Sequence, residues 1–117
     1  MDGQKPFDVW ISDDDNRVNV ILNGSLVMAD IVNWTRRLLE DTKVLEKGYI
    51  LVCDISDHIT LDTAGLAIIK DTLEILISRG LTKILFFIDS VCKSYNQLSE
   101  IAKKVLKDVE FKIKINP

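Results

Sequence analysis

The chain has 117 residues, 47% of them hydrophobic and 28% charged, and a formal net charge of −3. This length predicts a single domain, and this composition excludes a disordered or low-complexity chain. The acidic balance argues against nucleic-acid binding, and no segment approaches the roughly 18 consecutive apolar residues of a membrane-spanning helix.

The N-terminal part of the chain predicts a β-hairpin. Residues 1–6 are polar and contain a proline, so we expect a flexible tail before a single domain over 7–117. Apolar side chains alternate over 7–11 and 17–22, which is the period of a half-buried strand. The intervening aspartates, Asp13, Asp14 and Asp15, favour a turn. We expect them to be solvated, because they lack the spacing of a calcium-binding loop.

Helices and strands are expected to alternate after the hairpin. Apolar residues at helical spacing predict helices over 29–45, 62–79 and 95–107. Near-continuous apolar runs at 49–55 and 83–88 are typical of strands covered on both faces. An alternating segment at 109–115 carries lysines and predicts an edge strand. The order β-β-α-β-α-β-α-β predicts an α/β fold in which helices pack on a mixed, mostly parallel sheet.

The two tryptophans differ in their expected environment. Trp34 lies on the apolar side of the first predicted helix, which favours a place in the core. Trp10 falls on the polar side of the first strand, so we expect it to be exposed, where it could mark a contact surface.

No pattern typical of catalysis or cofactor binding is found. The five glycines are scattered, which argues against a phosphate-binding loop. His58 is the one histidine and no G-x-S-x-G motif accompanies it, so a surface histidine is favoured over a hydrolase triad. Asp54 and Asp57 could suit magnesium with a phosphate, but nothing in the sequence would hold the phosphate. We therefore expect a protein that is not an enzyme and uses no cofactor or metal.

The cysteines and the N-terminus bear on location. Cys53 and Cys92 have no thiol or histidine at ligand spacing, and two isolated cysteines fit a reducing compartment. The first residues lack the basic and apolar regions of a secretory signal. The cytoplasm is the expected location, without direct insertion into a membrane.

The residues over 54–66 form the most unusual segment of the sequence. It joins a buried strand to a helix, and sites in open α/β sheets collect at the carboxyl ends of strands. Asp62 or Thr63 can cap the helix, and Gly65 in its first turn would let another backbone approach closely. A capped helix without a site explains these residues equally well.

The run Leu61-Asp62-Thr63-Ala64-Gly65-Leu66, placed between that strand and that helix, resembles the STAS domain family. The family includes bacterial anti-sigma factor antagonists, and the resemblance covers nearly the whole chain because the expected element order also matches. It implies that a partner serine kinase, itself the anti-sigma factor, phosphorylates Thr63. The expected partner-binding residues are Asp57, Asp62, Thr63, Ala64 and Gly65.

A second group of STAS proteins is similar in a different way. Antagonists often carry Gly-Glu-Leu/Ile-Asp after the second strand, whereas this chain has Gly24-Ser25-Leu26-Val27. A threonine at the position of Thr63 also resembles the MlaB-type subunits of phospholipid-transport ABC complexes, which bind the ATPase of the transporter. A sensory scaffold of the stressosome kind is a third possible setting.

Overall fold

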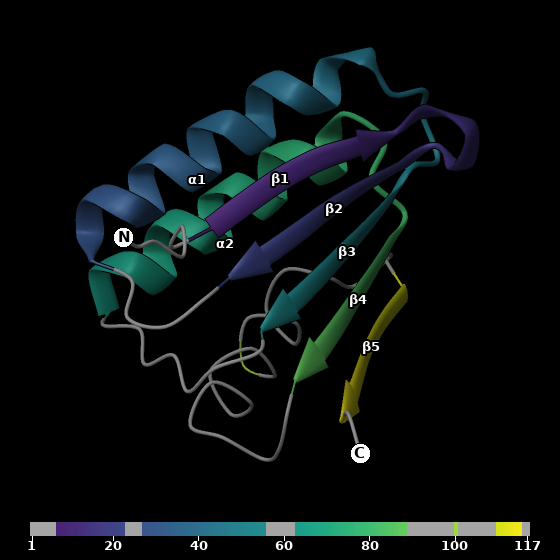
Figure 1. Ribbon diagram of the computed structural model, residues 1–117. Coiled ribbons are helices and arrows are strands. Elements are labelled where there is room, and N and C mark those ends of the chain that lie inside the picture. The colour runs from purple at the N-terminus through teal and green to yellow at the C-terminus, as the bar shows by residue number, and fades with distance from the viewer. Residues whose placement is uncertain (1–6, 23–26, 56–62, 89–99, 101–109, 116–117) are drawn as a thin grey trace, which may run out of the picture.

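The structure is a computed structural model that describes residues 7–22, 27–55, 63–88, 100 and 110–115. Within them a five-stranded sheet is packed against two α-helices (Figure 1). The strands, in chain order and in order across the sheet, are β1 (Phe7–Ser12), β2 (Arg17–Leu22), β3 (Ile50–Ile55), β4 (Lys83–Ile88) and β5 (Glu110–Ile115). The helices are α1 (Met28–Asp41) and α2 (Thr63–Ser78), and the short 3-10 turns are η1 (Asp13–Asp15) and η2 (Thr42–Val44).

The sheet is mixed, as the sequence predicts. β1 and β2 are antiparallel, with Val9 opposite Val20, and the three remaining pairs are parallel. Parallel neighbours require crossovers, which α1 supplies between β2 and β3 and α2 between β3 and β4. Both crossovers step across the sheet in the same direction, so the right-handed rule places both helices on one face. Figure 1 shows α1 and α2 side by side there.

One face of the sheet and both helices form the core. Val18, Leu51 and Ile84 pair across three strands in one row and are almost completely buried. The helices contribute Ile31, Trp34 and Leu38 from α1 and Ile69, Leu73 and Leu76 from α2 to the same cluster. The core position expected for Trp34 is confirmed.

The opposite face differs from the expectation for β3 and β4. Ile50, Val52 and Leu85 are only partly buried, so these strands are not covered equally on both faces. The physical reason is that α1 and α2 both pack on the other face. Trp10 also lies on this second face, opposite Asn19, and is 43% exposed, as its place in the pattern predicts.

Three buried threonines hydrogen-bond to the backbone of α1 and α2, which the apolar pattern does not predict. Thr35, Thr42 and Thr72 each donate the side-chain hydroxyl to the backbone carbonyl four residues earlier, at 2.7–2.8 Å. These bonds satisfy the hydroxyls and allow them to be buried. α1 ends at Asp41, earlier than the predicted residue 45, because the chain tightens into η2 at Thr42.

Some predicted elements lie wholly or mostly outside the described residues. The expected tail over 1–6 is one, and the expected helix over 95–107 is described only at Glu100, which is helical. In the described ranges, no helix is long and apolar enough to span a bilayer.

Candidate functional site

The candidate site lies where α2 begins. Thr63 is the first residue of α2, and the chain reaches it after the carboxyl end of β3. Thr63 and Ala64 are exposed, whereas Gly65 is buried. The first helical turn therefore presents one hydroxyl and one methyl group to the surroundings, while the glycine faces inward.

The start of α2 is electrostatically suited to negative charge. The first backbone N–H groups of a helix have no partner within the helix, and the helix dipole has its positive pole there. A negatively charged group on Thr63 would lie close to these N–H groups and to the positive pole of the dipole. Asp57, His58 and Asp62 lie outside the described residues, so the partner-binding role expected for Asp57 and Asp62 stays a prediction.

Two exposed apolar residues lie at the start of α1. The sequence marks one of them, Val27, only as a departure from the antagonist pattern, and it does not mark the other, Met28. Val27 and Met28 are 61% and 38% exposed. The turn is fixed because the Val27 N–H donates to Asp30 Oδ2 at 3.0 Å and the Asp30 N–H donates to the Val27 carbonyl at 2.9 Å. The available signal was that Val27 and Met28 precede the buried stripe that starts at Ile31.

α1 and α2 both begin at the end of the sheet where the parallel strands have their carboxyl ends. β2 and β3 are parallel neighbours, and each runs at its carboxyl end into the helix that follows. Figure 1 shows both helices beginning at the same end of the molecule, and the two helices contact each other. Val27 and Met28 thus lie at the same end of the molecule as Thr63.

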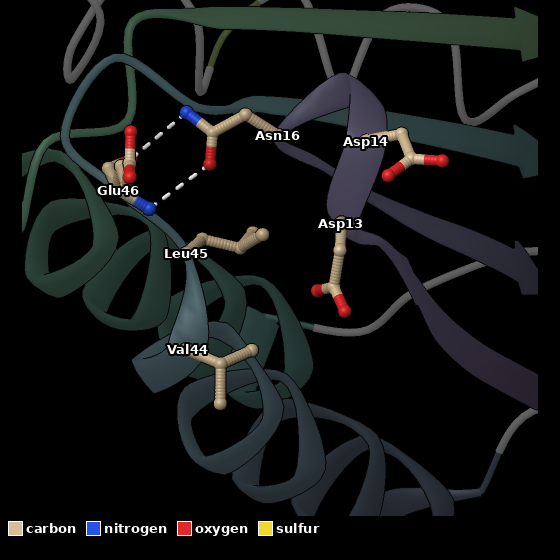
Figure 2. A pocket seen from close by; sticks show the side chains of 6 residues that line it. All are labelled: Asp13, Asp14, Asn16, Val44, Leu45 and Glu46. Carbon is tan, nitrogen blue, oxygen red and sulfur yellow. Dashed lines mark hydrogen bonds between the residues drawn. The ribbon is translucent and has the colours of Figure 1, made fainter.

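A hollow of about 400 Å³ lies at the opposite end of the sheet, where the parallel strands begin. Its walls come from the β1–β2 turn and from the segment before β3, and it is lined by Asp13, Asp14, Asn16, Val44, Leu45 and Glu46 (Figure 2). The three carboxylates point in different directions rather than toward one centre. Among the described residues no group of three or more His, Cys, Asp or Glu side chains is arranged to hold a metal ion.

Asn16 holds the two walls of this hollow together. Its side-chain amide donates to the Glu46 carbonyl at 3.1 Å, and its side-chain oxygen accepts the Glu46 N–H at 2.9 Å. Its own carbonyl accepts the N–H of Ile50 at 3.2 Å. The exposed aspartates of η1 are the solvated turn that the sequence predicts, and Asn16 gives this end of the molecule a structural role.

Two buried groups, Cys53 and Tyr49, have shifted pKa values, and neither shift indicates a reactive centre. Cys53 is a buried free thiol, and burial, with a smaller effect of the charge on Asp54, raises its pKa. A neutral thiol is a poor nucleophile. Burial also raises the pKa of Tyr49, whose hydroxyl donates to the Leu76 carbonyl at 3.1 Å and so links the residue before β3 to α2.

A scan against protein-family models finds no match for this chain, and no curated protein is significantly similar to it in sequence.

Proposed function

We propose that this chain is a non-enzymatic regulatory binding protein of the STAS kind, similar to an anti-sigma factor antagonist. It binds a kinase-type anti-sigma partner, and phosphorylation of Thr63 switches the binding off. The observation that carries the proposal is the place of Thr63, exposed at the first residue of α2 and beyond the carboxyl end of β3. A kinase can reach a hydroxyl in that position without unfolding the domain.

The surroundings of Thr63 suit docking of a protein surface. Ala64 is small and exposed, and Gly65 adds no side chain to the first turn. Val27 and Met28 supply exposed apolar area at the same edge of the sheet. Unphosphorylated, this edge combines a neutral hydroxyl with apolar groups, which is the mixture expected at the centre of a protein interface.

The switch follows from charge. A phosphate on Thr63 adds about −1.5 to −2 charges at pH 7. The helix start tolerates this charge, so the fold persists. A partner surface shaped for a neutral hydroxyl loses affinity because the charge must be desolvated or meets like charge. Asp62, the preceding residue in the sequence, adds to the local negative charge.

Phosphorylation of this kind needs no catalytic group from this chain. The Thr63 Oγ1 attacks the γ-phosphorus of ATP held by the partner, the bond to ADP breaks, and the hydroxyl proton passes to a base on the partner. The chain supplies the exposed hydroxyl and the docking surface around it.

Affinity capture from the cells that express the protein tests the proposal. The baits are the wild type, Thr63→Ala, Thr63→Glu and the control Ser78→Glu, which adds the same charge at the exposed far end of α2. Mass spectrometry is expected to find an anti-sigma kinase with every bait except Thr63→Glu. Equal capture of the kinase by Thr63→Ala and Thr63→Glu would refute the switch.

A second function is favoured by one observation. Val27 is an exposed apolar residue where the antagonist pattern has an acidic one. This difference supports an MlaB-like subunit that binds the ATPase of a phospholipid-transport ABC complex. Capture of an ABC ATPase by the wild type, retained by Ser78→Glu and lost by Val27→Asp, would favour this function and make Thr63 a docking residue.

A further inference from the structure

The outer edge of β1 carries an unusual arrangement around Val9. β1 is an edge strand of the sheet, and an edge strand presents the backbone groups of alternate residues to any incoming strand. The Val9 N–H donates to Asp8 Oδ1 at 2.9 Å, and the Val9 carbonyl accepts a hydrogen bond from Arg37 Nη2 at 2.9 Å. Both backbone groups of Val9 are therefore bonded to side chains, which places them on the side of β1 that faces away from β2.

Arg37 reaches this edge from α1 and is held there by two carboxylates. Its Nε donates to Asp41 Oδ2 at 3.3 Å, one helical turn further along α1. Its Nη1 lies 3.9 Å from Asp8 Oδ1, the oxygen that accepts the Val9 N–H. The planar guanidinium serves several acceptors at fixed angles, so it bridges α1 and the β1 edge in one orientation. Figure 1 shows α1 running alongside β1.

We propose that Arg37 and Asp8 close the β1 edge against strand addition by a second copy of the chain. The two copies would pair antiparallel through β1, because a two-fold contact between identical edge strands is self-complementary. Val9 lies near the middle of the six-residue strand, so such pairing competes with Asp8 for its N–H and with Arg37 for its carbonyl. With those groups occupied, self-association of the wild type through β1 is weakened.

Sedimentation velocity over a concentration series tests this closure. The variant is Arg37→Ala, and the control is Arg36→Ala, whose exposed arginine makes no hydrogen bond or ion pair to β1 in the described part of the chain. Arg37→Ala is expected to self-associate about tenfold more tightly than wild type, because it frees a carbonyl at the middle of the edge and releases Asp8 from Arg37. Identical self-association of Arg37→Ala and Arg36→Ala would overturn the proposal.

Two further variants guard against loss of folding. Asp8→Ala keeps Arg37 but frees the Val9 N–H, so its Val9 amide is expected to exchange with solvent faster than in wild type. Arg37→Lys keeps the cation but not the guanidinium fork, and its self-association is expected to lie between wild type and Arg37→Ala. If Asp8→Ala leaves the Val9 exchange unchanged, or if Arg37→Lys associates no more than wild type, edge closure by these side chains is wrong.

Discussion

Asn16 shows how much a single residue contributes to this fold. It has a positive φ of 49° and, with one side chain, forms two hydrogen bonds to the backbone of Glu46. Asparagine tolerates this left-handed conformation better than most residues. A local turn and a contact 30 residues away along the chain thus depend on the same position.

Replacing Asn16 separates these two roles. Asn16→Gly keeps the left-handed conformation and loses two hydrogen bonds, so the free energy of unfolding is expected to fall by about 1–3 kcal/mol. Asn16→Ala also loses the favourable conformation, and we expect a further loss of about 1 kcal/mol. Urea unfolding measures both. A wild-type midpoint for Asn16→Gly would mean that the bonds to Glu46 contribute nothing.

Gly48 and Gly80 have similar backbone conformations but different surroundings, so alanine substitutions at the two positions can be compared. Both have positive φ, 116° and 95°, and the Gly48 N–H donates to the Gly80 carbonyl at 2.8 Å. A Cβ on Gly80 would lie 2.8 Å from the Cα of Lys47, whereas a Cβ on Gly48 meets nothing within 4 Å. Gly48→Ala is expected to cost about 1–3 kcal/mol from backbone strain, and Gly80→Ala about 1–3 kcal/mol more because two backbones must separate.

Urea unfolding of Gly48→Ala and Gly80→Ala side by side is the measurement. Equal losses of stability would show that the close approach at Lys47 has no energetic weight. The sequence predicts that Gly80 closes α2, since glycine is the common residue just past a helix. It cannot predict the contact with Lys47, which depends on how the two loops meet in space.

At the scale of elements, β5 is attached to β4 partly through charge. Glu110 lies opposite Lys83, and the two side chains form an ion pair at 3.0 Å. The hydrogen bond and the charge of Lys83 lower the pKa of Glu110. A carboxylate with a lowered pKa in the folded state stabilises the fold above its unfolded pKa, and this contribution disappears as the pH falls through the folded value.

The expected result is therefore a pH-dependent effect of Glu110→Gln. The variant should be slightly less stable than wild type at neutral pH, and the difference should vanish in acid below the folded pKa of Glu110. Both side chains are partly exposed, so the effect is small and salt reduces it. Glu46→Gln is the control, because that carboxylate forms no ion pair in the described part. A stability difference that persists in acid would contradict this role of Glu110.

Elements were the level at which the sequence was most informative. The hairpin, α2 and the strands β3 and β4 follow from period and from apolar runs, because those patterns reflect burial directly. The sequence does not predict the end of α1 or the burial of the threonines, because a hydroxyl that hydrogen-bonds to its own helix looks polar in the sequence. It does not predict the partial exposure of Ile50 and Val52 either, since an apolar run does not reveal on which face the helices pack.

At the scale of the whole molecule, the parallel strands bring the starts of both helices to the same end of the sheet. The sequence identified Thr63, Ala64 and Gly65 through their place between a strand and a helix. It does not predict that Val27 and Met28 are exposed, because their exposure depends on where α1 begins relative to the sheet. The candidate site therefore combines one part that a local motif reveals with one that only the topology reveals.

We expect that a negative charge at Thr63 leaves the molecule folded. Thr63→Glu is expected to change the free energy of unfolding by less than about 1 kcal/mol, with a tendency to stabilise, because the charge meets the positive pole of α2. Ser78→Glu puts the same charge at the last residue of α2 and is expected to destabilise slightly. Thermal unfolding of both variants checks this order, and greater destabilisation by Thr63→Glu would argue against a switch that preserves the fold.

Isothermal titration of the proposed kinase-type partner with two forms of the chain is the most direct test of the proposed function. One form carries a phosphate on Thr63 and the other does not. The phosphate is expected to weaken binding by at least about a hundredfold, since like charge or buried unpaired charge in an interface costs several kcal/mol. Equal affinities of the two forms would contradict it.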